Sequence, residues 1–142
     1  MRKSVYLGIT GDIISPGIIN IVNEGARLGE LTVGLLTDRA IVSHKRIPYL
    51  SFEQRKMVVE GLKGMGRGVP QDDWSYVPNL RRYKPDIMIH GDDWKSNYLS
   101  KEREDCFRVV NEWGGKIVEV PYTRGHQLNR LGRKCLHNRH HS

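Results

Sequence analysis

Four short segments of the sequence, residues 10–18, 37–49, 91–95 and 121–125, combine polar or charged side chains with turn-forming residues. In the first, Gly17 opens a helical pattern, and the N–H groups and dipole of a helix N-terminus can bind a phosphate. In the second, Lys45 and Arg46 can either reach such a phosphate or form a solvated polar loop. From the residue types alone, the solvated loop is the favoured reading, and phosphate binding is the alternative.

The third segment, His90-Gly91-Asp92-Asp93-Trp94, supplies an imidazole and two adjacent carboxylates. Asp92 and Asp93 can line a pocket or cap the following turn, and nothing in their spacing indicates that they ligate a metal ion. The sequence has neither GxxxxGK[ST] nor GxGxxG, so no P-loop or dinucleotide-binding turn explains these segments. Two cysteines, Cys106 and Cys135, lie far apart and outside metal-type spacing, which favours a reducing compartment and a cytoplasmic location.

An alternation of strand and helix patterns must position these segments. Apolar, β-branched runs predict strands over residues 4–10, 31–36, 68–70, 86–90 and 116–120. Helical patterns cover residues 16–28, 52–62, 77–83 and 101–113, and a capping box at Ser51–Gln54 marks the second start. This order predicts an α/β fold with a doubly wound parallel sheet of about five strands. Ligands of such sheets bind at the carboxyl ends of the strands, which the four segments follow.

The length and the net charge of the chain limit which binding partners are expected. The 142 residues fit one domain, and the formal net charge is +7. Five basic residues and no acid follow Thr123, which leaves about +2 for residues 1–123. The basic charge is thus in the C-terminal segment and not on a patterned face, so we expect no nucleic-acid partner. No apolar run approaches the ~20 residues of a membrane helix, so we expect no membrane partner.

The same segments resemble the motifs of the cytidylyltransferase-like nucleotidyltransferases. The segment Thr10-Gly11-Asp12-Ile13-Ile14-Ser15-Pro16-Gly17-Ile18 is similar to the first signature, an aspartate, two apolar residues and His-x-Gly-His. The segment Tyr49–Arg55 resembles the stretch before a family arginine. Gly91-Asp92-Asp93-Trp94 matches the motif of glycerol-3-phosphate cytidylyltransferase relatives. Tyr122-Thr123-Arg124-Gly125 stands where the family has Arg-Thr-x-Gly-Ile-Ser. The resemblance covers residues 4–125.

Within this family, the chain most resembles the cytidylyltransferase domain fused to phosphoenolpyruvate mutase in phosphonate biosynthesis. The shared motifs are Lys45-Arg46-Ile47-Pro48-Tyr49-Leu50, the helix beginning Val77-Pro78, Lys84-Pro85-Asp86 and Gly91–Lys95. The resemblance implies a single Rossmann-like domain of the HxGH type. It implies transfer of a cytidylyl group from CTP to a small phosphonate or phosphate, with release of pyrophosphate. It further implies Mg²⁺ with the CTP and a homodimer.

The resemblance also assigns roles to residues. The catalytic residues are expected to be Ser15, Lys45 and Arg46. The nucleotide-binding residues are expected to be Thr10, Gly11, Asp12, Gly17, Ile18, Arg55, His90, Gly91, Asp92, Asp93, Trp94 and Thr123. Other readings stay open for several of them. Asp12 can brace its turn, Arg55 can hold a loop, and Trp94 can be core packing.

Two departures bear on activity. Ser15 and Ile18 occupy the positions of the two signature histidines, whose imidazoles donate to phosphate oxygens. Ser15 can still donate one hydrogen bond, and Ile18 can donate none. Loss of one preorganised donor typically costs ~10²–10³ in rate, so the resemblance implies an impaired enzyme. The alternative is a non-catalytic nucleotide-binding or dimerisation module, and a third reading is an ATP-dependent adenylyltransferase.

The C-terminal segment, residues 124–142, departs from the family altogether. Codons that can encode Gly125–Gly132 give Gly-Ile-Ser-Ser-Thr-Ala-Leu, the family continuation, when read one base later. We therefore interpret residues 1–123 as the cytidylyltransferase-like domain and residues 124–142 as a frameshift product. A metal-binding role for the histidines of this tail is the alternative, but their spacing is not that of metal ligands. A tail so polar is expected to be mobile.

Overall fold

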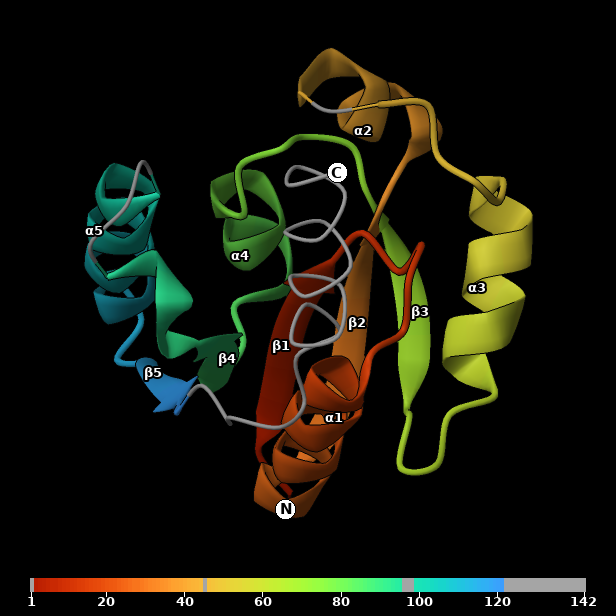
Figure 1. The fold of residues 1–142 in the computed structure, drawn as a ribbon. Coiled ribbons are helices and arrows are strands. Elements are labelled where there is room, and N and C mark those ends of the chain that lie inside the picture. Colours follow the sequence, from red (N-terminus) through yellow and green to blue (C-terminus); the bar gives the residue numbers. More distant parts are fainter. Residues whose placement is uncertain (1, 45, 96–98, 122–142) are drawn as a thin grey trace, which may run out of the picture.

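A five-stranded parallel sheet with the order β3-β2-β1-β4-β5 forms the centre of the molecule in the computed structural model (Figure 1). The structure describes residues 2–44, 46–95 and 99–121. The strands are β1 (Ser4–Ile9), β2 (Glu30–Leu36), β3 (Arg67–Gln71), β4 (Ile87–Gly91) and β5 (Lys116–Val120). The helices are α1 (Pro16–Leu28), α2 (Asp38–His44), α3 (Phe52–Glu60), α4 (Val77–Tyr83) and α5 (Ser100–Asn111). A 3₁₀ turn, Asp92–Trp94, follows β4.

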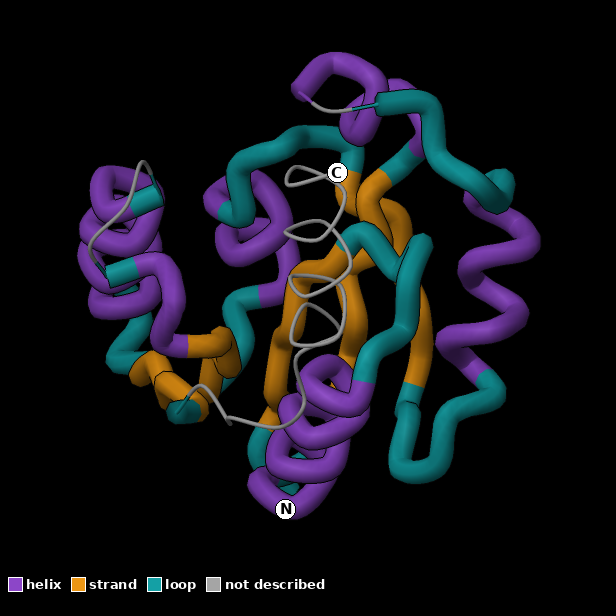
Figure 2. Tube along the Cα trace, in the orientation of Figure 1, coloured by secondary structure: helices purple, strands orange, loops and turns teal. Residues whose placement is uncertain are grey.

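The strand order reverses between β1 and β4, as the sequence predicts for a doubly wound sheet. The chain adds β2 and β3 on one side of β1 and then returns to add β4 and β5 on the other (Figure 2). All four strand pairs are parallel. The crevice at the carboxyl ends of β1 and β4 is therefore the switch point at which such sheets bind ligands.

Two apolar layers cover the two faces of the sheet. On one face, the buried strand residues pack with Val22 of α1 and Val59 of α3. On the other, Tyr6 and Met88 pack with Leu80 of α4 and with the buried residues of α5. Because β1, β2 and β4 are covered on both faces, their sequences read as nearly continuous apolar runs.

Local signals fix the helices nearest the switch point. Ser15 caps α1, Pro16 begins it, and Gly29 follows its last residue. At the start of α3, the Ser51 hydroxyl accepts from the Gln54 N–H, and the Gln54 side chain accepts from the Ser51 N–H. The predicted capping box is thus confirmed.

One helix was not predicted. Residues 37–49 were expected to form a loop, but residues 38–44 are the helix α2. Thr37 accepts from the Ala40 N–H through its hydroxyl, and Ala40 and Ile41 are buried against Leu36. Two buried residues in a seven-residue helix make too short a pattern for periodicity to reveal.

Several predictions fall on residues outside the described ranges. These are the roles of Lys45 and Thr123 and all statements about the segment 124–142, including its frameshift origin and its mobility. Within the described residues, no helix has the length and apolar composition to cross a membrane.

Candidate functional site

A cavity of about 360 Å³ lies at the carboxyl ends of β1 and β4. Backbone and small side chains from residues 8–11 form one wall, and Ile14 and Ile18 form another. Trp74 and Tyr76, from the loop between β3 and α4, form the third, with His90 and Asp93 at the end of β4. The cavity therefore occupies the place that the strand order predicts for a ligand.

A second cavity, of about 220 Å³, lies on the other side of the α1 N-terminus. It is lined by Ser15, Gly17 and Ile21 from α1 and its cap, and by Gly91 and Val120 from the ends of β4 and β5. Ile18 and Asp93 line both cavities. The two hollows are thus neighbouring parts of one surface around the start of α1.

The start of α1 offers few hydrogen-bond donors to a ligand. Pro16 has no N–H, and the Ile18 N–H donates to the Ser15 hydroxyl at 3.4 Å. The Ile19 N–H donates to the Ser15 carbonyl oxygen at 3.1 Å. Within the part of the chain that the structure describes, this leaves the Gly17 N–H as the amide of the first turn that can bind a phosphate.

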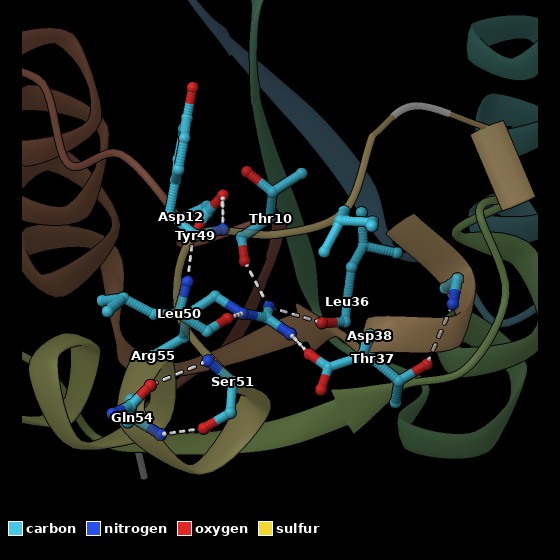
Figure 3. Close-up of polar contacts among 12 residues, drawn as sticks. Thr10, Asp12, Leu36, Thr37, Asp38, Tyr49, Leu50, Ser51, Gln54 and Arg55 are labelled. Carbon is cyan, nitrogen blue, oxygen red and sulfur yellow. Dashed lines mark hydrogen bonds and ion pairs between the residues drawn. The ribbon is translucent and has the colours of Figure 1, made fainter. Parts of the chain in front are cut away.

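Arg55 holds together the loops beside the larger cavity, and its contacts are drawn in Figure 3. Its guanidinium donates to the carbonyl oxygens of Thr10 and Leu36 at 2.6 Å each, to that of Leu50 at 3.0 Å, and to Asp38 at 2.6 Å. The Arg55 side chain is fully buried. Of the two roles considered for Arg55, the structure shows the one that holds the loop, and it joins the ends of β1 and β2.

Asp12 holds the segment before α3 in the same region (Figure 3). Its carboxylate accepts from the Tyr49 and Leu50 N–H groups at 2.9 and 3.1 Å and from Arg46 at 2.7 Å. Burial opposes ionisation of Asp12, but these hydrogen bonds outweigh it and lower the pKa of the carboxyl below its ordinary value. Asp12 and Arg46 are therefore paired with each other in this structure, and Asp12 braces its turn.

Three aromatic side chains pack together at the end of β4. His90 stacks on Trp94 with ring centroids 3.7 Å apart, and the Tyr76 hydroxyl lies 3.1 Å from His90 Nε2. Burial lowers the pKa of His90 below its ordinary value, because desolvation disfavours the charged imidazolium. Trp94 is fully buried and donates from its indole N–H to Glu119 at 2.7 Å. His90 thus faces the cavity, and Trp94 packs behind it.

The structure gathers about half of the expected residues at the two cavities. Thr10, Gly11, Ser15, Gly17, Ile18, His90, Gly91 and Asp93 line one or both of them. Asp12, Arg46 and Arg55 brace the surrounding loops, Asp92 lies in the 3₁₀ turn, and Trp94 lies in the core.

Sequence reasoning missed Trp74 and Tyr76. They lie in an irregular segment that directly follows β3. Their signal was available, because residues that follow a parallel strand stand at the ligand-binding edge of the sheet. β3 is an edge strand, as predicted, and its carboxyl end still contributes to the cavity through Trp74 and Tyr76.

Among residues 2–44, 46–95 and 99–121, no three His, Cys, Asp or Glu side chains converge as a metal site. Mg²⁺ commonly binds through one or two carboxylates together with substrate phosphates. Asp93, which lines both cavities, is the carboxylate that fits this arrangement.

Comparison with known proteins agrees with the fold and the motifs. The FAD synthase of Ferroglobus placidus is 34% identical over 93 residues, which are 66% of this chain and 60% of that enzyme. This chain therefore spans only three fifths of that relative's length. The FAD synthase of Archaeoglobus fulgidus is 30% identical over 103 residues, 68% of this chain and 75% of that enzyme. The glycerol-3-phosphate cytidylyltransferase of Bacillus subtilis is 26% identical over 127 residues, 88% of this chain and 90% of that enzyme.

The solved structures show the same architecture. The lipopolysaccharide core biosynthesis protein of Thermoplasma volcanium matches with a TM-score of 0.69 at 22% identity, over 87% of this chain and 98% of that chain. The sequence profile of the Cytidylyltransferase-like family matches residues 9–127, which include every residue that lines the two cavities except Gly8. The chain belongs to the Cytidylyltransferase-like family of nucleotidyltransferases.

Proposed function

We propose that the two cavities around the α1 N-terminus bind CTP, and that the chain transfers the cytidylyl group slowly to a small phosphonate or phosphate. The observation that carries the proposal is that Ile18 and Asp93 line both cavities at the switch point of the sheet. A nucleoside triphosphate that spans the two cavities would pass the helix N-terminus between them.

The reaction requires little covalent chemistry from the protein. An oxygen of the acceptor attacks the α-phosphorus of CTP, and the bond to pyrophosphate breaks. Mg²⁺, held mainly by the phosphates of the nucleotide, would supply neutralisation of charge on the leaving group. This chain contributes the Gly17 N–H, the Ser15 hydroxyl and the walls that orient the substrates.

The rate is expected to be low, because Ile18 has no polar atom in its side chain and Ser15 offers a single hydroxyl hydrogen where the family has an imidazole. Replacement of each family histidine is expected to cost ~10²–10³. A module that binds the nucleotide without turning it over is the second candidate function, and the same apolar Ile18 favours it. In either case we propose a cytoplasmic homodimer without nucleic-acid or membrane partners.

The proposed acceptor and the proposed nucleotide rest on different observations. The phosphonate acceptor rests on the sequence motifs that this chain shares with the cytidylyltransferase domain fused to phosphoenolpyruvate mutase. ATP is the alternative nucleotide, favoured by the 34% identity to an FAD synthase.

Calorimetric titration with CTP·Mg²⁺ and with ATP·Mg²⁺ decides between the nucleotides. A pyrophosphate-release assay with 2-hydroxyethylphosphonate, glycerol 3-phosphate and FMN decides the acceptor. We expect CTP to bind and 2-hydroxyethylphosphonate to give slow release. Binding without release in all mixtures would establish the non-catalytic module, and ATP binding with release on FMN would replace the cytidylyl assignment.

A further inference from the structure

Glu102 of α5 holds the loop that carries the aromatic wall of the larger cavity. The Ser75 hydroxyl and the Tyr76 N–H both donate to Glu102 Oε1, at 2.8 Å each. The Ser75 hydroxyl oxygen in turn accepts from the Val77 N–H at 3.2 Å, at the start of α4. One carboxylate oxygen outside the cavity thus fixes the backbone at Tyr76.

Tyr76 connects this fixed backbone to His90 at the wall of the larger cavity. Its hydroxyl lies 3.1 Å from His90 Nε2, and its ring packs edge-on against His90 with centroids 5.4 Å apart. Its ring is also pressed against β1, because a Cβ on Gly8 would lie only 2.7 Å from two of its ring atoms. A shift of the backbone at Tyr76 would therefore move the Tyr76 ring and release His90.

The next residue of α5 holds the opposite side of the same aromatic group. Arg103 donates twice to Glu119 at 2.9 Å, and Glu119 accepts from the Trp94 indole at 2.7 Å. Trp94 in turn stacks on His90. Consecutive residues of one helix therefore anchor both neighbours of His90, Tyr76 from one side and Trp94 from the other.

We propose that Glu102 is a positioning residue of the nucleotide site, which holds Tyr76 and through it His90 against the bound nucleotide. This inference rests on the proposed function of the cavities. Both partners of Glu102 in the loop are donors, so its role requires an acceptor oxygen and not a negative charge. A glutamine at position 102 keeps that oxygen, and a leucine removes it.

The test compares Glu102→Gln with Glu102→Leu. Both variants lose the charge, so a difference between them reports the acceptor alone. The affinity for CTP·Mg²⁺ is measured by calorimetry and the titration of His90 by NMR. We expect the glutamine variant to bind within about twofold of the parent and the leucine variant about tenfold more weakly.

The His90 titration is a readout that does not require a ligand. The polar and charged groups that act on His90 are Tyr76, Asp93, Glu119, the Gly91 carbonyl oxygen and Glu102 itself, whose charge both variants remove. If Tyr76 moves away, water reaches the imidazole, and the pKa of His90 in the leucine variant rises toward its ordinary value relative to the glutamine variant. Equal His90 titrations in the two variants, with equal CTP affinities, would overturn the proposal.

The Ser75→Ala variant and CTP binding by the parent cover the outcomes in which Glu102→Leu does not fold or the proposed function fails. Ser75→Ala removes one of the two loop donors and is expected to weaken CTP binding about threefold, so the proposal can be tested even if Glu102→Leu does not fold. Parent-like binding and His90 titration in Ser75→Ala would then contradict it. If the parent itself fails to bind CTP, the proposed function fails, and the His90 titrations alone decide whether Glu102 positions the imidazole.

Discussion

The side-chain oxygen of Ser15 lies 3.4 Å from the backbone nitrogen of Ile18 and accepts its N–H. By their resemblance to the first family signature, these two residues take the places of its two histidines. The pair therefore stabilises the start of α1 instead of presenting two imidazoles to a phosphate. If the proposed function holds, we expect binding and catalysis to be separable in this chain, because the cavities are present while the two imidazoles are absent.

Restoring both histidines should restore catalysis. In the double variant Ser15→His, Ile18→His we expect the rate of pyrophosphate release to rise at least ~10²-fold, since each imidazole is a donor at the transferring phosphate. The loss of the Ser15 cap should cost about 1 kcal/mol of stability. The double variant Ser15→Asn, Ile18→Leu changes the same positions without an imidazole and should stay at the parent rate. Equal rates in the two double variants would contradict the role given to these positions.

Arg55 should be essential for stability. Replacement by methionine leaves three carbonyl oxygens and Asp38 without their donor, and we expect the free energy of unfolding in urea to fall by about 3 kcal/mol. As a control, Arg27→Met removes an exposed pair with Glu24 and should change stability by less than ~1 kcal/mol. A fall no larger than that of the control would show that the Arg55 hydrogen bonds do not hold the strand ends together.

Glu119 should make stability depend on acid pH. Its hydrogen bonds to Arg103, opposed by burial and supported by Trp94, lower its pKa from 4.5 to about 2. A carboxyl with a lowered pKa stabilises the folded state above its ordinary pKa, and the contribution is lost as the pH falls through the folded value. The stability difference between the parent and Glu119→Gln should therefore be constant above about pH 5 and shrink toward pH 2. A difference that does not change with pH would contradict this pairing.

Gly8 should be intolerant of a side chain. A Cβ there would lie 2.7 Å from the Tyr76 ring and 2.9 Å from the Gln71 side-chain oxygen. We expect Gly8→Ala to lower the free energy of unfolding by about 1–3 kcal/mol and to weaken CTP binding, because Tyr76 must shift. Gly61→Ala, where the nearest atom is 3.4 Å away, serves as the control for urea unfolding and calorimetry. Gly8→Ala with the stability and affinity of Gly61→Ala would show that the aromatic wall is not fixed.

The sequence predicted most of the sheet because its signals are local. The apolar run of β2 and the capping box of α3 each depend on a few neighbouring residues. The α2 helix was missed because only Ala40 and Ile41 are buried among its seven residues, and part of what packs on them comes from Trp74, far along the chain. The bracing role of Arg55 was only one of two readings, since its carbonyl partners belong to three separate segments.

The most direct test of the central claim is an NMR titration of the ¹⁵N-labelled chain with CTP·Mg²⁺. We expect saturable shifts at the amides of Gly11, Gly17, Ile18 and Gly91 and at the His90 imidazole, which line the two cavities. Amides of β3 and α3 away from the cavities should not move. No saturable shift, or shifts confined to residues remote from β1, β4 and the start of α1, would contradict the assignment of these cavities as a nucleotide site.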